Sequence, residues 1–416
     1  MSEVVSLEEL CTGIIDCPHS TPKWQDKGIP VIRNYNLKDG KIDCANLSFV
    51  SEEDYKERVK RAIPEESDII ISREAPMGVV GIVPKGFQCC LGQRLVLLKI
   101  DKSKCLPKYL LYTLMSEYVQ LQIRRINQTG SIVSNLNISS LRELKIPLHS
   151  FEEQKKIANI LSAIDDKISL NNQINQELEA MAKTLYDYWF VQFDFPDQNG
   201  KPYKSSGGKM VYHPEVKREI PEGWGVEDLK EFESKIITGK TPSRANSDNF
   251  GGEIPFITIG DIRGNTFIYR TSESLTDLGA SVQQNKYLPE GSLCVSCIAT
   301  VGEIGFTTEP SHTNQQINSI VFEDETNRYY LYFALKNYFE NANASAKTGN
   351  TFANMNKEDF SGIRIILPSE EIKKNFHEIS EPYFAQIKCL QGQNQELIQL
   401  RDWLLPMLMN GQVKVE

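Results

Sequence analysis

The chain has 416 residues, of which 40% are apolar and 24% are charged, and its formal net charge at pH 7 is −9. This length exceeds one ordinary core, so we expect two or more domains, and no apolar run approaches the ~18 residues that a membrane-spanning helix needs. The acidic start MSEVVSLEEL lacks a signal-peptide pattern, which favours a cytoplasmic protein.

Residues 1–149 are predicted to form a mixed α+β domain. The runs SDIIIS, VVGIV and RLVLLKI are rich in β-branched residues and alternate with Gly, Pro and Asn turns, which indicates strands. The helical segment KYLLYTLMSEYVQLQIRRI follows and leads into the loop QTGSIVSNLN at 128–137. Residues 1–150 carry slightly more basic than acidic side chains, although the net charge of the whole chain argues mildly against a nucleic acid partner.

Residues 150–195 are predicted to form one long helix. Ser150 and Glu153 make a capping box, and neither Gly nor Pro occurs from 151 to 195. Apolar residues alternate in steps of four and three, as in a coiled-coil seam, so we expect packing against a partner helix. The predicted seam comprises Ile157, Leu161, Ile164, Ile168, Leu178 and Leu185.

Residues 225–368 are predicted to form a second domain that repeats the first. The segment between the copies, 196–224, is rich in Pro, Gly, Lys and Ser and reads as a linker. Matches in the same order, about 220 residues apart, indicate an internal duplication rather than a solenoid. They include Thr21-Pro22 with Thr241-Pro242, GQR at 92–94 with NQQ at 314–316, and the loop at 128–137 with KTGNTFANMN at 347–356.

Residues 369–416 are predicted to form a second, less regular long helix. Its seam comprises Phe376, Ile379, Tyr383, Leu390, Leu397 and Leu404. Pro382 removes a backbone hydrogen-bond donor, so we expect a kink or a break there. Asn394 falls within this stripe, as Asn171 and Asn175 fall within the first. Buried Asn would fix the register of the helices, and Asn facing solvent is the alternative.

No spacing typical of a catalytic or metal site is found in the sequence. Cys294 and Cys297 lie in the apolar run LCVSCIA without a second pair or a nearby His, which favours core residues. Thr238-Gly239-Lys240-Thr241 resembles the end of a phosphate-binding loop but lacks the earlier Gly of that motif. A nuclease or hydrolase using Asp165-Asp166 is the enzymatic alternative, whereas a solvated charge pair on an exposed helical face is the simpler interpretation. We therefore expect a binding protein and not an enzyme.

Several stretches resemble the DNA-specificity subunit of type I restriction-modification systems. They are EEQKKIANILSAID and NQELEAMAKTLYDYWF in the first copy, IPEGW at the start of the second, and NQEL followed by LLPMLMNGQ near the end. The second copy departs from the pattern, with EEIKKNF in place of EEQKKIA.

The resemblance implies an α+β fold with two pseudo-repeated α/β target-recognition domains separated by two long antiparallel coiled-coil-like helices. It implies that each domain reads one half of a bipartite double-stranded DNA target. Two modification subunits would supply S-adenosylmethionine and adenine methylation, and two restriction subunits, where present, would supply ATP-driven cleavage. This chain itself would hold no cofactor and no metal. The alternatives are a specificity chain of a type IIG/IIB-like system with a fused methylase-nuclease partner, and a coiled-coil scaffold that binds no DNA.

Residues that can read bases are those with fixed donors and acceptors, such as Arg and Lys for guanine and Asn and Gln for adenine. The candidates in the first copy are Thr21, Lys23, Arg33, Asn34, Tyr35, Asn36, Arg73, Gln93, Arg94 and Ser131. The candidates in the second copy are Lys240, Thr241, Ser243, Arg244, Asn246, Thr258, Arg263, Thr300, Gln315, Gln316, Lys347 and Asn350.

Overall fold

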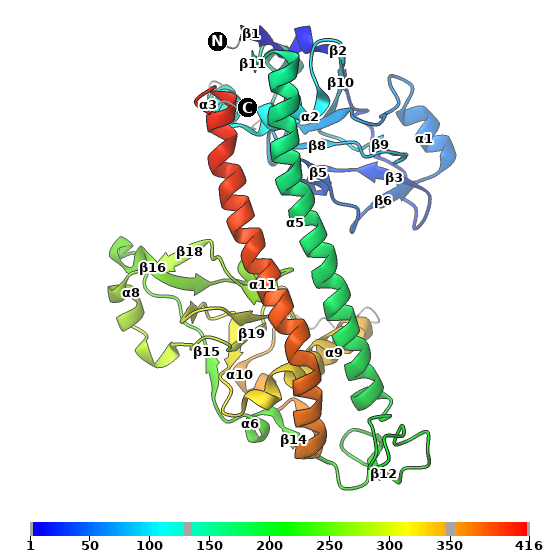
Figure 1. Ribbon diagram of the computed structural model, residues 1–416, viewed down its shortest axis with the longest axis vertical. Coiled ribbons are helices and arrows are strands. Elements are labelled where there is room, and N and C mark those ends of the chain that lie inside the picture. Colours follow the sequence, from blue (N-terminus) through cyan, green and yellow to red (C-terminus); the bar gives the residue numbers. More distant parts are fainter. Residues whose placement is uncertain (1–2, 129–134, 347–353, 414–416) are drawn as a thin grey trace. The chain divides into compact units, whose positions relative to one another are not determined.

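The computed structural model describes residues 3–128, 135–346 and 354–413. The chain divides into two compact units: unit 1 comprises Met1–Ile168 with Leu397–Glu416, and unit 2 comprises Ser169–Glu396. The division passes through helices α5 (Phe151–Tyr186) and α11 (Glu370–Met409), so each long helix contributes one part to each unit (Figure 1). Among the described residues, no helix is long and apolar enough to cross a membrane.

Unit 1 contains a four-stranded antiparallel sheet of order β2-β10-β7-β8 and a three-stranded sheet of order β6-β3-β9. Ile69–Ser72 is buried along its whole length, as its β-branched sequence predicts for a central strand. The strands are β1 (Glu3–Ser6), β2 (Cys11–Asp16), β3 (Ile29–Ile32), β4 (Leu37–Lys38), β5 (Lys41–Ile42), β6 (Ser48–Val50), β7 (Ile69–Ser72), β8 (Val80–Ile82), β9 (Cys90–Leu91), β10 (Leu95–Ile100) and β11 (Lys145–Leu148). The helices before α5 are η1 (Leu7–Leu10), η2 (Asn34–Asn36), α1 (Glu52–Arg58), α2 (Pro107–Met115), α3 (Glu117–Gln128) and α4 (Ile138–Arg142).

Unit 2 contains a five-stranded sheet of order β15-β22-β19-β20-β17 and a three-stranded sheet of order β18-β16-β21. Its strands are β12 (Met210–His213), β13 (Arg218–Pro221), β14 (Gly225–Asp228), β15 (Ile236–Thr238), β16 (Phe250–Ile257), β17 (Phe267–Ile268), β18 (Glu273–Leu275), β19 (Leu293–Ser296), β20 (Ile304–Thr307), β21 (His312–Thr313), β22 (Ile317–Ile320) and β23 (Arg364–Leu367). Its helices besides α5 and α11 are the π-helix η3 (Asp187–Val191), α6 (Leu229–Phe232), η4 (Ser247–Asn249), α7 (Ile259–Ile262), α8 (Asp277–Ser281), η5 (Gln284–Lys286), η6 (Glu325–Asn327), α9 (Arg328–Ala346) and α10 (Lys357–Ser361).

The two units share their strand pairing, which confirms the predicted duplication. In unit 1, β3 pairs antiparallel with β6 and parallel with β9. In unit 2, β16 pairs in the same way with β18 and β21. The central strand β10 lies between β2 and β7, just as β22 lies between β15 and β19. The same topology is therefore built twice from sequences that share few residues.

The predicted linker carries regular structure of its own. β12 and β13 form an antiparallel hairpin, with Met210 opposite Pro221. Ile220 is buried in the core of unit 2, and Trp224 stacks on Phe195 with ring centroids 5.0 Å apart. The segment therefore packs onto unit 2 instead of running free, although the division into five segments stays a prediction.

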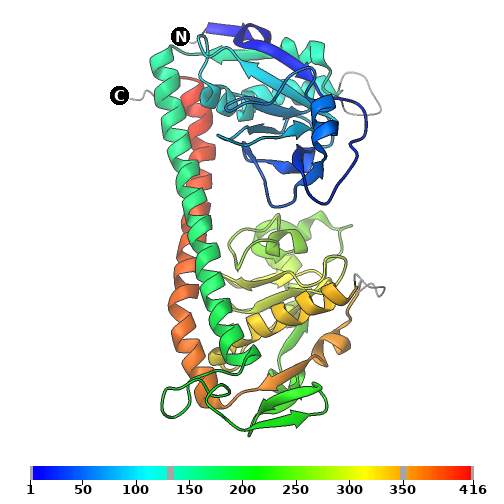
Figure 2. The ribbon, with the colours of Figure 1, turned by 90° about the vertical axis from the view of Figure 1, so that its right-hand side faces the viewer.

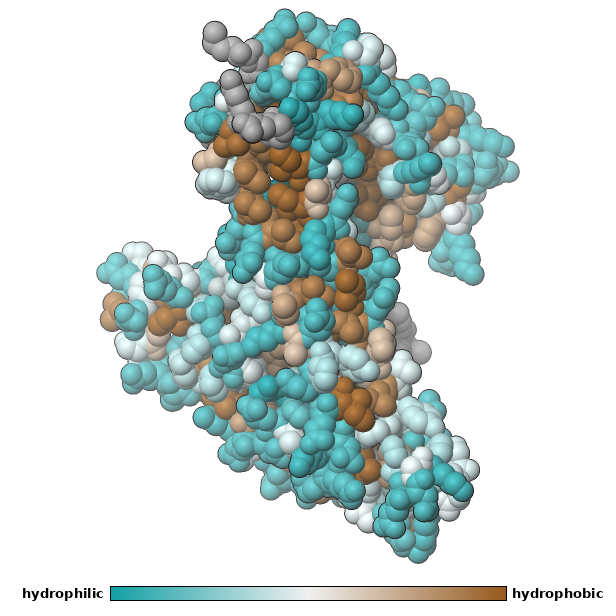
Figure 3. All heavy atoms as spheres, in the orientation of Figure 1, coloured by the Kyte–Doolittle hydropathy of each residue, from teal (hydrophilic) through white to brown (hydrophobic). Residues whose placement is uncertain are grey.

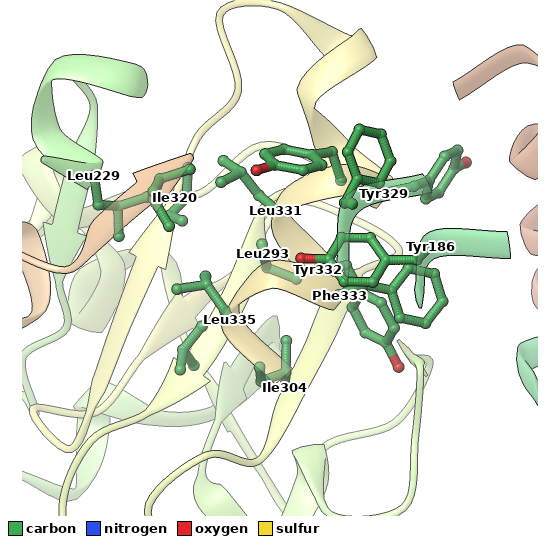
Figure 4. Close-up of a cluster of buried hydrophobic side chains, with 14 of the residues drawn as sticks. Tyr186, Leu229, Leu293, Ile304, Ile320, Tyr329, Leu331, Tyr332, Phe333 and Leu335 are labelled. Atoms are coloured by element: carbon green, nitrogen blue, oxygen red, sulfur yellow. The ribbon is translucent and has the colours of Figure 1, made fainter. Parts of the chain in front are cut away.

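The core of unit 2 is dominated by aromatic side chains from α9 and the two long helices. Tyr329, Tyr332 and Phe333 of α9 lie around Tyr186 of α5, with aliphatic residues of α6, α9 and the sheet beside them (Figure 4). Tyr332 donates its hydroxyl hydrogen to Glu179 of α5 at 2.6 Å. The helix α9 thus fixes the C-terminal part of α5 against the sheet.

In unit 1, the beginning of α5 packs against the end of α11. Leu405, Leu408 and Met409 share a core with Ile157 and Leu161, and the two segments lie side by side in both ribbon views (Figure 1, Figure 2). Asp165 accepts a hydrogen bond from Arg401 at 3.0 Å and another from the Tyr112 hydroxyl at 2.6 Å.

The expected solvated pair Asp165-Asp166 is therefore wrong for its first member. Asp165 is buried, and its carboxylate is satisfied by the Arg401 guanidinium and the Tyr112 hydroxyl, whereas Asp166 is exposed. The two carboxylates are adjacent in the sequence, but the side chains of neighbouring helix positions point about 100° apart. Only Asp165 therefore faces the core. Asp165 and Asp166 thus do not form the exposed carboxylate pair that the enzymatic alternative invoked.

In unit 2, the end of α5 packs antiparallel against the beginning of α11. Tyr186 contacts Phe376, and Asn171 is hydrogen-bonded to Asn394, so residue numbers rise along one helix as they fall along the other. Asn171, Asn175 and Asn394 are all buried. The alternative that these residues face solvent is therefore wrong.

The predicted break of α11 at Pro382 does not occur, because α11 is one helix from Glu370 to Met409. Pro382 lies on the exposed side, and Phe376, Phe384 and Ile387 are fully buried on the other. Burying three such side chains contributes ~1.5–3 kcal/mol each, which outweighs the ~3 kcal/mol cost of an interior proline. The buried stripe also runs through Ser380 rather than Ile379, which is 43% exposed.

Apolar side chains also lie on the outer surfaces of both long helices. Figure 3 shows apolar residues among polar ones along this face of α5 and α11. Exposed members include Leu170 and Met181 of α5 and Leu400 and Trp403 of α11.

Candidate nucleic-acid interface

A tight turn that follows a central strand has the same hydrogen bonds in both units. Ser72 Oγ donates to the Pro76 carbonyl at 2.6 Å and accepts from the backbone N–H seven residues after it at 2.9 Å. Ser296 Oγ donates to the Thr300 carbonyl at 2.6 Å and accepts from the backbone N–H seven residues after it at 2.8 Å. The exposed tips differ, because unit 1 presents Pro76 where unit 2 presents Thr300.

Glycines close both of these turns. Gly78 has φ of +83° and Gly302 has φ of +94°, a region that favours glycine. A Cβ at Gly78 would lie 3.0 Å from Ile123, and one at Gly302 would lie 2.7 Å from Phe339. The turns are therefore held close to a helix, and the residues at their tips are positioned by the scaffold.

A second matched turn follows β3 in unit 1 and β16 in unit 2. The Arg33 N–H donates to Asn36 Oδ1 at 3.0 Å, and the Thr258 N–H donates to Asp261 Oδ2 at 2.7 Å. Asn36 is fully buried and gives its amide hydrogens to two backbone carbonyls at 3.2 Å. The structure thus places Asn36 inside the turn and leaves Arg33 exposed beside it.

The described end of the repeated loop is a helix start in both copies. Leu136 and Met355 are buried, and their N–H groups donate to the backbone carbonyls of Arg73 and Cys297. The next residue in each copy, an Asn, caps α4 or α10 with its side-chain oxygen, at 2.7 Å and 2.9 Å. The residues that recur at this end of the loop therefore have a structural role, as a buried contact and a helix cap. The candidates Ser131, Lys347 and Asn350 lie outside the described residues.

Arg73 is used inside unit 1. Its guanidinium binds Asp16 at 2.8 Å and the Leu136 carbonyl at 2.9 Å, and it also reaches Asn135 at 3.2 Å. This arrangement ties the end of the repeated loop to the main sheet. The sequence carries no sign of this ion pair, because Asp16 is 57 residues away from Arg73.

Asn34, Gln93 and Arg94 lie around one edge of unit 1. Asn34 Nδ2 donates to the Glu74 carbonyl, and the exposed Arg94 is ion-paired with the Glu74 carboxylate at 3.1 Å. Gln93 Nε2 donates to the His19 carbonyl. The structure thus brings Asn34 and Arg94 together on one residue of the matched turn.

Several exposed candidates of unit 1 lie near the start of the domain. Thr21 and Lys23 are exposed, and Arg33 lies over the rings of both Trp24 and Tyr35. Trp24 was not among the sequence candidates. Its position two residues after the repeated Thr-Pro pair, in the run TPKW, was the available signal.

In unit 2, both candidate arginines are paired with carboxylates. Arg244 binds Glu273 through two nitrogens at 2.9 and 2.8 Å, and this pairing lowers the pKa of Glu273, so the pair stays ionised at neutral pH. Arg263 lies 3.2 Å from Glu303 and donates to Thr300 Oγ1 at 3.0 Å. The structure thus brings Arg263 and Thr300 together at the tip of the matched turn.

The remaining candidates of unit 2 lie in the segment between β15 and η4 and in the segment after β21. Thr241 donates to Gln315 at 2.6 Å, and Gln316 accepts from the neighbouring Asn314 at 3.1 Å. Asn246 caps η4 at 3.2 Å, whereas Lys240 and Ser243 are exposed.

The two cysteines of the run LCVSCIA belong to the core of unit 2. Cys294 and Cys297 are buried, and burial raises the pKa of their thiols to about 12 and about 11 respectively. A thiol ligates metal or reacts as the thiolate, which burial disfavours here. Within the described ranges, no group of three or more His, Cys, Asp or Glu is arranged to hold a metal ion.

Comparison with known proteins gives the same duplication an independent basis. The family model of the type I restriction modification DNA specificity domain matches twice, at residues 2–180 and 221–399. The chain belongs to the type I restriction-modification specificity subunit family. It is therefore the recognition component of such a system, with two repeated target-recognition domains, and not a catalytic subunit.

Individual specificity subunits match most of the chain. The HindI specificity subunit of Haemophilus influenzae is 33% identical over 362 residues, which cover 74% of this chain and 78% of the relative. The MjaIX specificity subunit of Methanocaldococcus jannaschii is 28% identical over 389 residues, which cover 90% and 86%. The crystal structure of the type I S subunit from M. genitalium shares the fold, with a TM-score of 0.52 and 16% identity over 98% and 96% of the two chains.

Proposed function

We propose that each unit of this specificity subunit reads one half of a bipartite DNA target. The observation that carries the proposal is the pair of matched turns, in which one hydrogen-bonding scaffold presents different side chains in the two units. At equivalent positions unit 1 has Arg33 and Pro76, and unit 2 has Thr258 and Thr300. Two readers that share a scaffold and differ at their tips are suited to two unlike half-sites.

The partners proposed for this chain are two modification subunits and, where they exist, two restriction subunits. The modification subunits would bind S-adenosylmethionine and methylate adenines, and the restriction subunits would use ATP. The chain itself would bring neither cofactor. Because the complex must reach chromosomal and incoming DNA, we place it in the cytoplasm. The residues proposed to touch DNA remain the exposed candidates of the two units.

The experiment is a map of methylated adenines in cells that express this chain with its modification partner. The expected result is one motif with two short defined parts separated by undefined bases. A single uninterrupted motif would contradict the assignment of one half to each unit, and a palindromic split motif would contradict the two unlike half-sites. A variant lacking the modification partner's catalytic activity serves as the control for background methylation.

A further inference from the structure

Arg33 differs from the other four arginines among the candidate residues. Arg73, Arg94, Arg244 and Arg263 each have a carboxylate partner at 2.8 to 3.2 Å. Within the described part of the chain, Arg33 has no such partner. An arginine whose charge is not neutralised inside the protein retains more of its attraction for an anionic or strongly accepting ligand.

Two aromatic rings hold the Arg33 side chain. Its central guanidinium carbon lies 5.2 Å from the Trp24 ring centroid and 4.8 Å from the Tyr35 ring centroid. Both rings are themselves accessible, since Trp24 is 45% and Tyr35 is 53% exposed. Ring contacts of this kind restrain a guanidinium without using its N–H donors, which lie in the guanidinium plane.

The backbone at this place is fixed as well. The Arg33 N–H is bonded to the buried Asn36, and the Tyr35 hydroxyl lies 3.4 Å from Ser48 Oγ on β6. The Arg33 backbone is therefore fixed by the turn, which lowers the conformational entropy that binding would cost. Unit 2 has Thr258 and Gly260 where unit 1 has Arg33 and Tyr35, so this arrangement belongs to unit 1 alone.

We propose that Arg33 reads a guanine in the half-site of unit 1, and that Trp24 and Tyr35 are the residues that position it. A planar guanidinium can donate two parallel hydrogen bonds to guanine O6 and N7, the commonest specific contact of arginine with a base. Trp24 and Tyr35 supply the contacts that keep the guanidinium extended. The inference rests on the proposed function, because it assumes that unit 1 reads its own half-site.

The test uses the full chain in complex with its modification partner and duplexes in which each base pair of the methylation motif is replaced in turn. The measurement is the ratio of dissociation constants between the motif and each single replacement. For the wild type, replacing the guanine read by Arg33 is expected to weaken binding about tenfold or more. In Arg33→Ala and Arg33→Lys, that ratio is expected to fall toward one, with the other half of the motif unchanged. Trp24→Ala is expected to reduce the ratio partially.

The controls separate base reading from charge and from folding. Arg61→Ala removes another exposed positive charge from unit 1 and is expected to leave every ratio unchanged. Equal thermal unfolding midpoints show that the variants are folded. The inference would be overturned if Arg33→Lys kept the wild-type ratio at the guanine. It would also be overturned if Arg33→Ala weakened binding to every duplex equally and left the guanine ratio intact. Either result would make Arg33 a phosphate contact. Unchanged ratios in both Arg33 variants would overturn it too, whereas changes in both halves at once would instead refute the division of the target between units.

Discussion

Asn171 Nδ2 donates to Asn394 Oδ1 at 2.9 Å across the buried interface of the two long helices in unit 2. Asn171 also reaches Gln393 at 2.8 Å, and Asn394 donates to Asn172 at 2.8 Å. The network joins residues more than two hundred positions apart, and its three hydrogen bonds form only when the helices have this register. It therefore disfavours sliding of one helix along the other in unit 2.

Replacing Asn171 by Leu is expected to destabilise unit 2, because the buried side-chain oxygen of Asn394 would lose its donor. The expected loss is about 1–3 kcal/mol in the free energy of unfolding, measured by chemical denaturation. Asn175→Leu is the matched comparison one turn later, because the Asn175 amide is buried and makes no hydrogen bond to a described residue. An Asn175 variant that loses more stability than the Asn171 variant would contradict this account.

The buried pair of Asp165 and Arg401 offers a test in unit 1. Both side chains are 10% exposed, and Arg401→Met would leave the carboxylate buried beside only the Tyr112 hydroxyl. The expected cost is about 3–5 kcal/mol, whereas Asp165→Asn combined with Arg401→Met should cost clearly less than the two single changes added together. Additive costs in the denaturation experiment would show that the two groups do not interact. Asp166→Asn, on the exposed side of α5, serves as the control.

The matched serines should act independently. Ser72→Ala and Ser296→Ala each remove a hydroxyl that closes a turn, so each is expected to destabilise its own unit by about 1–3 kcal/mol. In the complex with the modification partner, each is also expected to weaken discrimination in only one half of the methylation motif. The two variants control for one another. If either serine variant altered both halves, the turns would not be separate readers.

The start of α5 should depend on pH through Glu153. The Ser150 hydroxyl donates to Glu153 at 2.7 Å, and this bond, together with the backbone N–H of Ser150, lowers the pKa of Glu153. A carboxyl whose pKa is lower in the folded state adds stability above its unfolded pKa of about 4.3, and this is lost as pH falls through the folded value. Glu153→Gln should therefore be less stable than the wild type at pH 7, with the difference shrinking below pH ~4.

The same pH series with Glu152→Gln provides the comparison for this prediction. Glu152 is exposed and lies 3.7 Å from Lys156, a weak surface pair, so its replacement should change the unfolding midpoint little. A Glu153 variant whose deficit stays constant from pH 7 to pH ~3 would show that the carboxylate charge is not the cause.

Local signals in the sequence predicted local structure well. The capping box of Ser150 and Glu153 is confirmed, because a cap depends on residues three positions apart. The long helices and the duplication were also predictable, since periodicity and collinear matches extend over many residues. The buried state of Asn171 was open until its partner Asn394, far along the chain, was known to face it.

What the sequence did not reveal depends on distant partners. Arg73 was a candidate base reader, but the structure shows Asp16 beside its guanidinium. Arg33 became the stronger candidate because no carboxylate pairs with it in the described residues and because Trp24 and Tyr35 lie beside its side chain. A kink or a break was expected at Pro382, but α11 continues through it. The burial of Phe384 and Ile387 against α9 and the sheet favours the continuous helix, and such tertiary packing is not visible in the local sequence. Local propensity therefore predicted the helices and strands, whereas long-range packing determined which polar side chains remain free to contact DNA.

The central claim, that each unit reads its own half of the target, is tested most directly by exchanging one unit at a time. Residues 1–149 of this chain would be replaced by the matching domain of another specificity subunit, and residues 225–368 in a second chimaera. Each chimaera would be expressed with the modification partner, and methylated adenines would be mapped across the genome. The account predicts that each exchange changes one half of the motif and that the two exchanges change opposite halves. If either exchange changed both halves or left both intact, while the complex still assembled and methylated DNA, the claim would be contradicted.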